Sequence, residues 1–292
     1  MLVATLLALA AAVLHAAWNL AVKQSGDRFT ALWGQFFIAG LIGLTVILVT
    51  CALSSLGAHW PTGTPITGFP ATGWRWAAMS GSVHLPYCWF LAKAYDHGDF
   101  SLVYPMARGA GALLAAIGGL VLLGDHISPL GCAAIAVVAG GLMMLSGRGH
   151  DTGAGVRAAL VVALTIGAYS TIDAHGIRST DTPLYVMASF IGTAASTTIF
   201  SLASGRRVVM MNAMRSSWRR FATMGVASLV TYGMVQLAFQ RAAVGYVTAL
   251  RESSVVIAAF VGSRVLGESA GRRRMIASGV VLAGLILLVV AQ

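Results

Sequence analysis

Two arginines lie inside apolar segments of the sequence, in contexts that match each other. Arg108 lies in YPMARGAGALLAAIGGLVLLGD (104–125) and Arg251 lies in TALRESSVVIAAFVGSRVLGE (248–268). Aligning the two stretches places Arg108 on Arg251 and also brings the acidic residue that follows LG in each stretch into register. An arginine at the centre of a bilayer costs about 2.5–3.5 kcal/mol on insertion scales. Each arginine therefore needs a carboxylate, a water-filled cavity or free backbone carbonyls nearby.

Arg108 is predicted to point into a bundle of helices rather than toward lipid. Its helix face carries small residues on which a neighbouring helix can pack closely, namely Gly111, Ala115 and Gly119. Pro105 removes a backbone hydrogen bond one turn earlier, and Tyr104 lies four residues before Arg108 on the same face. A polar half-helix of this kind is typical of a substrate site near the membrane midplane.

Glu252 follows Arg251 directly, where the first stretch has Gly109. Neighbouring residues on a helix point about 100° apart, so adjacency alone does not neutralise Arg251. One of the two charged groups needs a partner elsewhere in the fold. Two interpretations stay open: a static ion pair that locks two parts of the protein together, or a site that responds to substrate or protons.

Other apolar segments carry polar and aromatic residues at helical spacing. His15, Trp18 and Asn19 share one face, His84 and Tyr87 flank Pro86, and Tyr232 precedes Gln236 by four residues. Each group alone is more typical of helix packing, but together they favour a shared central cavity. Asp173, four residues after Tyr169, is expected near the membrane boundary as a cap or snorkelling group. The predicted substrate-binding residues are His15, Trp18, Asn19, His84, Tyr87, Tyr104, Arg108, Tyr169, Tyr232, Gln236, Arg251 and Glu252.

The composition is that of a polytopic membrane protein. The chain has 292 residues, 58% hydrophobic and 10% charged, with a mean hydropathy of +0.81. The net charge of +10 comes from short basic clusters between apolar segments, which indicate membrane orientation and not a nucleic-acid partner. The three cysteines have irregular spacing and are expected to be free thiols. No cofactor or metal is expected.

Ten membrane spans are predicted, all helical because lipid satisfies no backbone polar group. Their ranges are 2–22, 30–53, 74–95, 101–123, 128–146, 156–175, 183–203, 221–243, 246–266 and 272–291. The fold class is therefore an all-α integral membrane protein.

The spans divide into two related halves. LHAAWN (14–19) aligns with TIGAYS (165–170), as the two arginine stretches align with each other. This predicts a first five-helix repeat at 1–146, a connector at 147–157 and a second repeat at 158–292. Because five is odd, the second repeat enters the membrane from the opposite face, which makes the repeat inverted around a central cavity.

The distribution of basic residues predicts orientation and location. Most Lys and Arg lie in connections that follow odd-numbered spans, which places both termini outside the cytoplasm. Abundant Ala and Gly, with far more Arg than Lys, point to a GC-rich bacterial genome. The expected location is the bacterial cytoplasmic (inner) membrane.

Several stretches resemble the ten-helix EamA-type members of the drug/metabolite transporter superfamily. They are HAAWN (15–19), GDFSLVYPMARG (98–109), LLGD (122–125) and ALRESSVVIAAFVGSRVLGE (249–268). The resemblance implies two inverted five-helix halves around a cavity lined by helices 1, 3, 4, 6, 8 and 9, with helices 5 and 10 as scaffold. It also implies export of amino acids, other metabolites or drugs, although some members import. The sequence departs from the family at Asp125, where Glu is common, and amino-acid exporters of the family generally keep their termini in the cytoplasm.

These observations predict a secondary transporter of a small polar or zwitterionic, amino-acid-like metabolite, with export by alternating access. Arg108 and Arg251 would hold a carboxylate or shape the field, and Glu252 would meet an amine or a coupling proton. One alternative is a membrane-embedded enzyme that uses His15 or His84, but HExxH, GxSxG, Walker and dinucleotide motifs are missing. Another is a broad-specificity exporter of cationic drugs, which the two arginines disfavour. The oligomeric state stays open.

Overall fold

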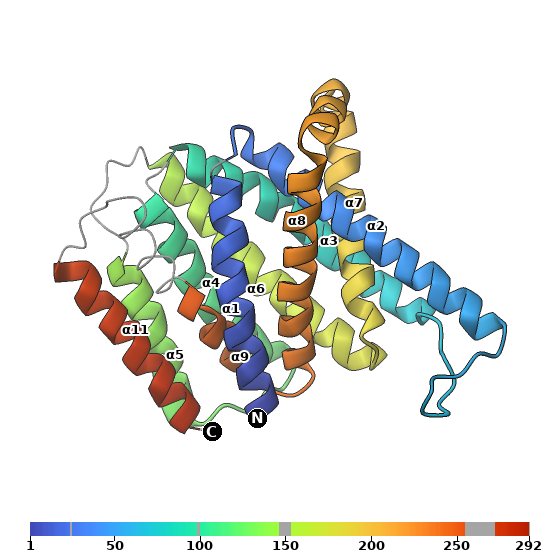
Figure 1. Cartoon of the computed structure of the whole chain (residues 1–292). Coiled ribbons are helices and arrows are strands. Elements are labelled where there is room, and N and C mark those ends of the chain that lie inside the picture. Colours follow the sequence, from blue (N-terminus) through green and yellow to red (C-terminus); the bar gives the residue numbers. More distant parts are fainter. Residues whose placement is uncertain (24, 98–99, 146–152, 255–271, 292) are drawn as a thin grey trace.

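The computed structural model describes residues 1–23, 25–97, 100–145, 153–254 and 272–291, and these ranges are helical apart from the connections, of which 56–70 is a long loop (Figure 1). The helices are α1 (Leu2–Lys23), α2 (Arg28–Ser55), α3 (Ala71–His97), α4 (Phe100–Leu122), α5 (Pro129–Leu145), α6 (Ala154–Thr180), α7 (Leu184–Ala203), α8 (Arg207–Phe239), α9 (Val244–Arg251) and α11 (Arg272–Val290). Helices satisfy their own backbone groups, so long apolar segments that meet lipid adopt this structure.

Each predicted span begins within a helix or one residue before one, and the all-helical prediction is confirmed. The ninth span runs on past residue 254, where it lies outside the described residues. By length and composition, four described helices are able to cross a membrane, namely α2, α6, α7 and α8.

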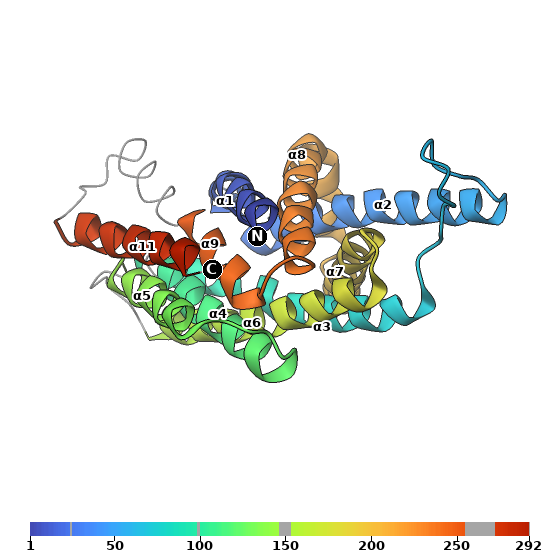
Figure 2. The same ribbon diagram turned by 90° about the horizontal axis from the view of Figure 1, so that it is seen from below.

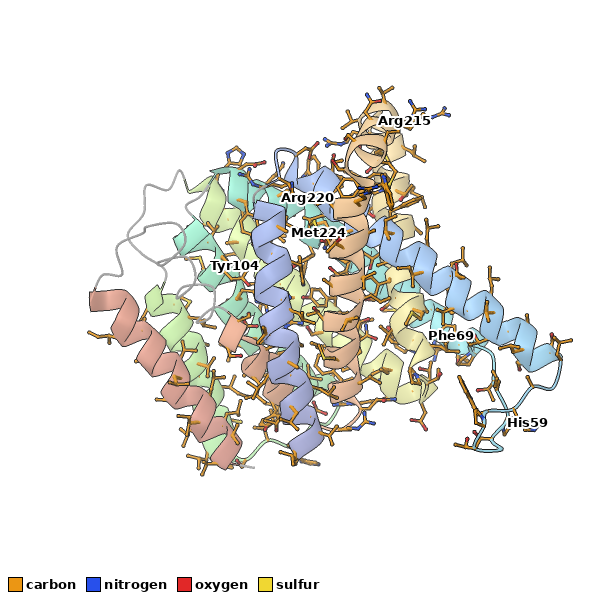
Figure 3. All side chains as sticks on the ribbon, in the orientation of Figure 1. His59, Phe69, Tyr104, Arg215, Arg220 and Met224 are labelled. Carbon is orange, nitrogen blue, oxygen red and sulfur yellow. The ribbon has the colours of Figure 1, made fainter. Side chains whose placement is uncertain are left out.

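The helix that contains the eighth predicted span begins well before that span. Residues 207–220 were expected to form a basic connection, yet α8 already begins at Arg207. No Gly or Pro interrupts this stretch, so nothing ends the helix there. Thirty-three helical residues measure about 50 Å, whereas the hydrocarbon core is about 30 Å thick. The N-terminal end of α8 therefore projects, and it carries Arg215 and Arg220 (Figure 3).

The helices pack in pairs that mix early and late parts of the chain. α5 packs on α11 at one edge of the molecule, and α2 packs on α7 at the other (Figure 2). Between these edges α6 packs on α3 and α4, while α1 packs on α8 and α9. α3 also contacts α7, and α2 contacts α8. Both termini lie at the same end of the molecule (Figure 1).

Glycines allow α3 and α7 to touch through their backbones. A Cβ built on Gly81 would lie 2.2 Å from the carbonyl carbon of Gly192, and one on Gly192 would lie 2.3 Å from the Ala77 oxygen. Ser196 of α7 donates a hydrogen bond of 2.7 Å to the Gly81 carbonyl oxygen. Small residues and interhelical hydrogen bonds replace the hydrophobic effect as the source of helix association in lipid. This contact fixes the position of α3, which carries His84 and Tyr87.

Asp27 joins the start of α2 to the start of α8. Its Oδ1 accepts a hydrogen bond of 2.9 Å from the Thr30 backbone, so it caps α2. It also forms an ion pair with Arg206. Partial burial acts to raise the pKa of Asp27, but the hydrogen bonds from Thr30 and the charge of Arg206 outweigh it and hold the pKa below its ordinary value.

The backbone contact between α3 and α7 predicts the effect of adding one methyl group. Gly81→Ala forces the two helices apart and lowers stability by about 1–3 kcal/mol, which thermal unfolding of the purified protein measures. Gly140→Ala in α5 is the matched control, because Gly140 is exposed and a Cβ added to it would meet nothing within 4 Å. Equal unfolding temperatures for the two variants contradict the close contact.

The low pKa of Asp27 predicts an acid-dependent loss of stability. Its contribution is complete above the ordinary value of 3.8 and is lost as the pH falls through the lower folded value. Between about pH 5 and about pH 3 the wild type therefore loses more stability than Asp27→Asn, which keeps a capping oxygen without the charge. Thermal unfolding across this range measures the difference. Asp181→Asn, at an exposed position, controls for surface charge, and parallel profiles for wild type and Asp27→Asn refute the prediction.

Candidate functional site

A cavity of about 40 Å³ lies among seven helices, α1, α2, α3, α6, α7, α8 and α9. This volume accommodates about three water molecules. Its lining residues are His15, Trp18, Phe36, His84, Tyr87, Tyr169, Ser189, Phe190, Thr193, Ser228, Thr231, Tyr232 and Arg251. The family resemblance implied lining from α4, but α2 and α7 contribute to this cavity instead. Seven of the twelve predicted site residues are in its wall.

Aromatic rings form much of the cavity wall. Tyr169 stacks on His84 with ring centroids 4.2 Å apart, and Tyr87 and Tyr232 meet Tyr169 edge to face at 5.5 and 5.9 Å. Such pairs contribute about 0.5–1.5 kcal/mol beyond the area they bury. They come from α3, α6 and α8, so three helices are held in register by one ring cluster. The sequence predicted these four residues as a site but not their contact with each other.

His84 has a defined role within this cluster. Its Nδ1 lies 2.9 Å from the Ser80 carbonyl oxygen, which accepts hydrogen bonds only. Nδ1 therefore carries the proton, and Nε2 is left as an acceptor. Elsewhere in the cavity wall, the ring of His15 meets Trp18 edge to face at 4.8 Å, and its Nε2 has no hydrogen-bond partner among the described residues.

Arg251 places a cation in the cavity wall. Its side chain is 1% exposed, and within the described part of the chain its Nε and Nη2 have no hydrogen-bond partner. Burying a hydrogen-bond donor without a partner costs free energy, so native structures contain few such donors and each needs an explanation. A guanidinium presents two parallel N–H groups that match a carboxylate. The arrangement is therefore suited to hold an anion.

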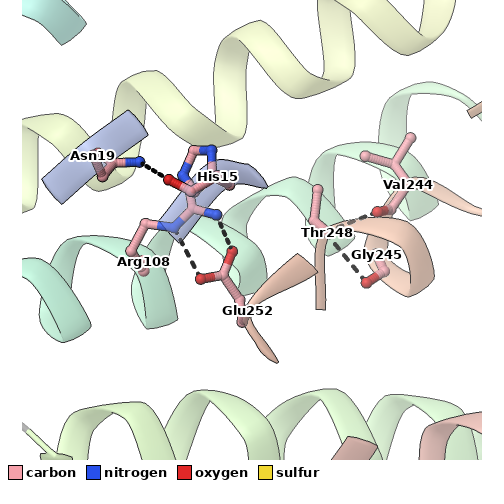
Figure 4. Close-up of polar contacts among 7 residues, drawn as sticks. All are labelled: His15, Asn19, Arg108, Val244, Gly245, Thr248 and Glu252. Atoms are coloured by element: carbon pink, nitrogen blue, oxygen red, sulfur yellow. Dashed lines mark hydrogen bonds and ion pairs between the residues drawn. The ribbon is translucent and has the colours of Figure 1, made fainter. Parts of the chain in front are cut away.

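Arg108 is paired, in contrast to Arg251. Its Nε donates to Glu252 Oε2 at 2.9 Å and its Nη2 donates to Oε1 at 2.6 Å (Figure 4). The pair joins α4 to the residue that follows α9, and both side chains are buried. His15 lies beside the Arg108 guanidinium in Figure 4. The partner that Glu252 needed elsewhere in the fold is thus Arg108, and Arg251 is the arginine left over.

Three further predicted residues are buried but lie outside the cavity wall. Asn19 donates to the His15 carbonyl oxygen at 2.9 Å within α1, and Gln236 donates to Ser189 Oγ at 3.0 Å. Tyr104 lies in α4 with a side chain 3% exposed. Gln236 supports the cavity indirectly, because its partner Ser189 lines it.

The prediction for Asp173 was wrong. It was expected at the membrane boundary, but it is fully buried, since α6 continues for two more turns to Thr180. Its Oδ1 accepts a hydrogen bond of 3.0 Å from Tyr185, and its Oδ2 accepts one of 2.6 Å from Tyr232. Because Tyr232 also lines the cavity, Asp173 lies directly behind the wall. Its spacing of four residues from Tyr169 was the signal for a shared inward face.

Six lining residues were missed by the sequence prediction. They are Phe36, Ser189, Phe190, Thr193, Ser228 and Thr231. Hydroxyl groups at helical spacing in α7 and α8 were the available signal, but Ser and Thr are common at helix interfaces, so the spacing does not separate packing from a cavity. No pattern in the sequence distinguishes Phe36 from the other apolar residues of its helix.

A network of hydrogen bonds surrounds Arg178. Its Nη1 donates to Asp125 Oδ1 at 2.7 Å, and its Nε and Nη2 donate to the carbonyl oxygens of Phe239 and Ala242 at 2.7 and 2.9 Å. Asp125 Oδ2 in turn accepts from the Val244 backbone at 2.7 Å. The network ties the end of α4, the end of α6 and the start of α9 together.

Comparison with known proteins agrees with this architecture. Residues 153–290 match the EamA-like transporter family. A solved structure titled only "Crystal structure of protein" has a similar fold, with a TM-score of 0.71 over 98% of this chain and 97% of that chain. At 18% sequence identity this likeness shows the fold alone. No curated protein matches the sequence.

An all-helical chain with apolar helices around a buried polar cavity is a multi-pass membrane protein. The match to residues 153–290 confirms the predicted resemblance to EamA-type members of the drug/metabolite transporter superfamily for this part of the chain. Members of this family are transporters and not enzymes.

Asp173 predicts a test of the buried hydrogen bonds. Asp173→Ala leaves the hydroxyl groups of Tyr185 and Tyr232 without their acceptor and lowers stability by about 1–3 kcal/mol, as measured by thermal unfolding. Asp96→Ala is the matched control, because Asp96 is half-exposed and its ion pair with Arg28 is worth about 0–1 kcal/mol. A smaller loss for Asp173→Ala than for Asp96→Ala contradicts the structural role.

Proposed function

We propose that this protein is a secondary transporter that binds a small carboxylate-bearing metabolite, zwitterionic amino acids included, in the aromatic cavity. Arg251 binds the carboxylate, and the rings of Trp18, Tyr87, Tyr169 and Tyr232 pack against the rest of the substrate. The observation that carries the proposal is the buried Arg251 guanidinium in the cavity wall, with two nitrogen atoms unpartnered within the described residues.

The charges around the cavity favour an anionic group over a cation. Arg251 is the permanently charged side chain among the described lining residues, and the nearby Glu252 is already bound to Arg108. A cationic drug would meet an uncompensated positive charge there, at a cost that low dielectric increases. The broad exporter of cationic drugs is therefore the weaker alternative.

The enzyme alternative meets a specific difficulty. Ser80 Oγ lies 3.3 Å from His84 Nδ1. In a hydrolytic triad the histidine lies between serine and aspartate and accepts the serine proton. Here Asp173 accepts hydrogen bonds from Tyr185 and Tyr232, and His84 Nδ1 faces the Ser80 carbonyl oxygen at 2.9 Å. This arrangement positions the histidine ring and does not activate a nucleophile.

Ten membrane-spanning helices in two inverted halves, 1–146 and 158–292, form the framework of the proposal. Exchanging α1 for α6, α2 for α7, α3 for α8 and α4 for α9 converts the pairs α3–α6, α4–α6 and α3–α7 into α1–α8, α1–α9 and α2–α8, all of which are in contact. This supports a twofold relation between the halves. With five helices in each half, such an axis lies in the membrane plane.

Alternating access fits the closed state of the site. The cavity has room for about three water molecules, and the network around Arg178 joins the residues just after α4, the end of α6 and the start of α9. A substrate the size of an amino acid enters only after the helices move apart at one end. The family resemblance favours export across the bacterial cytoplasmic membrane, with protons as a candidate coupling ion.

The role of Arg251 predicts a loss of transport without a loss of stability. In liposomes containing the purified protein, uptake and efflux of amino acids and small monocarboxylates are measured for wild type, Arg251→Met and Arg241→Met. Removing a buried charge that binds a carboxylate costs about 2–5 kcal/mol, so transport by Arg251→Met falls at least about 30-fold. Its unfolding temperature stays equal or rises, because an unpartnered buried charge is gone.

Arg241 is the control because it is exposed and donates only to the Leu237 carbonyl oxygen. Equal transport by all three proteins would remove Arg251 from the mechanism. A large drop in the unfolding temperature of Arg251→Met would mean that Arg251 serves the fold and not the substrate.

A further inference from the structure

Three charged groups are buried at one place next to the cavity: Arg108, Arg251 and Glu252, with residue exposures of 2%, 1% and 1%. The other ion pairs of the described residues, such as Arg178–Asp125, are partly exposed. Two guanidinium groups and one carboxylate leave a net charge of +1. A buried net charge is expensive, so its location within the cluster matters.

The geometry decides which arginine keeps the positive charge. Both oxygens of Glu252 accept hydrogen bonds from Arg108, which cancels the charge of Arg108 at short range. Glu252 is also near enough to Arg251 for the two charges to act on each other. Adjacent residues on a helix point about 100° apart. A Glu252 side chain that is held on Arg108 therefore points away from Arg251 and does not pair with it. The net charge is left on Arg251, in the cavity wall.

The cluster acts on the cavity from close range. The charges of Arg108 and Arg251 both act on His15, and His15 lines the cavity. His15 also lies beside Arg108 in Figure 4. At an effective dielectric constant near 20, two unit charges about 8 Å apart interact by about 2 kcal/mol. An unpaired Glu252 carboxylate is therefore strong enough to cancel much of the attraction that Arg251 offers to an anion.

We propose that Arg108 is a positioning residue that sets the sign of the charge in the cavity: by holding Glu252 in the buried ion pair, it keeps Arg251 free to bind an anion. The inference rests on the proposed function. It assigns the selectivity of the cavity for anions to a residue outside the cavity wall. Arg108 itself does not touch the substrate in this arrangement. Loss of Arg108 alone makes the cluster neutral, and loss of both Arg108 and Glu252 restores the charge of +1.

This charge count separates three roles for Arg108. If Arg108 positions Glu252, anion binding falls in Arg108→Met and returns in Arg108→Met/Glu252→Gln. If Arg108 binds the anion directly, binding falls in both. If the ion pair only stabilises the fold, Arg108→Met and Glu252→Gln lose stability alike. In that case no variant binds anions more tightly than neutral molecules.

The experiment measures binding of thiocyanate, a small anion that suits a 40 Å³ cavity. The bound fraction is obtained from the shifted C≡N infrared band at about pH 8, with full-length protein in liposomes. We expect binding about tenfold weaker in Arg108→Met and within about threefold of wild type in Arg108→Met/Glu252→Gln. Arg108→Lys, which keeps the charge, also stays within about threefold. Unfolding temperatures are measured for each protein.

Three results would overturn the inference. The double variant binding as weakly as Arg108→Met would place Arg108 in contact with the anion. Equal binding by wild type and Arg108→Met would show that Glu252 does not act on the cavity. Wild type binding no more tightly than Arg251→Met would show that the cavity lacks a net positive charge. If Arg108→Met does not fold, Arg108→Lys takes its place. Weak thiocyanate binding by a stable Arg108→Lys would contradict the inference, because this variant keeps the net charge of the cluster.

The proposed transport function can be refuted independently of the role of Arg108. Liposomes that take up no carboxylate, while thiocyanate binding follows the expected order across the variants, would refute transport and leave the charge-setting role of Arg108 standing. Carboxylate transport that is equal in Arg108→Met and wild type would leave transport standing and refute the role of Arg108.

Discussion

The cost of burying guanidinium groups in a low-dielectric interior is the constraint on which the structure depends. Two arginines stand inside apolar segments, and the described part of the fold supplies one carboxylate for both. Glu252 meets Arg108 with two short hydrogen bonds, a geometry that a buried ion pair needs to offset desolvation. Arg251 receives no such partner from the described residues. The site is thus built around an imbalance of charge, and the surrounding helices hold that imbalance in place.

Close helix packing is what makes such an arrangement possible. Lipid offers no hydrophobic driving force for association, so helices approach through small residues until their backbones touch. The Gly81–Gly192 contact between α3 and α7 is one example, and Gly225 of α8 against the Gln35 carbonyl of α2 is another. These contacts bring α2, α7 and α8 toward the ring cluster of His84, Tyr169 and Tyr232. The hydroxyl groups that line the cavity come from the same packed faces.

The sequence predicts the helices and the two arginines well, because apolar length and buried charge are strong signals in a membrane protein. It does not predict pairing across the fold. The 100° rule showed that Arg251 or Glu252 needed a distant partner, but only the packing of α4 against α9 identifies Arg108 as the partner of Glu252. Asp173 was misplaced because the end of α6 is polar, and polar helix ends resemble membrane boundaries. The start of α8 was missed because a basic stretch was expected to form a connection, whereas a helix can continue beyond the membrane.

The two ends of the short helix α9 relate the proposed opening of the cavity to its charge. At one end the Val244 backbone binds Asp125, just past α4, and at the other end Glu252 binds Arg108, within α4. One helix of the first half therefore holds both ends of α9. The contact at Asp125 includes the partly exposed Arg178, where water can replace lost hydrogen bonds, whereas the contact at Arg108 is buried. Separating the buried pair costs more, so α4 and α9 are expected to move together when the exposed end opens. Arg251 would then keep its charge throughout the movement, because Glu252 stays bound to Arg108.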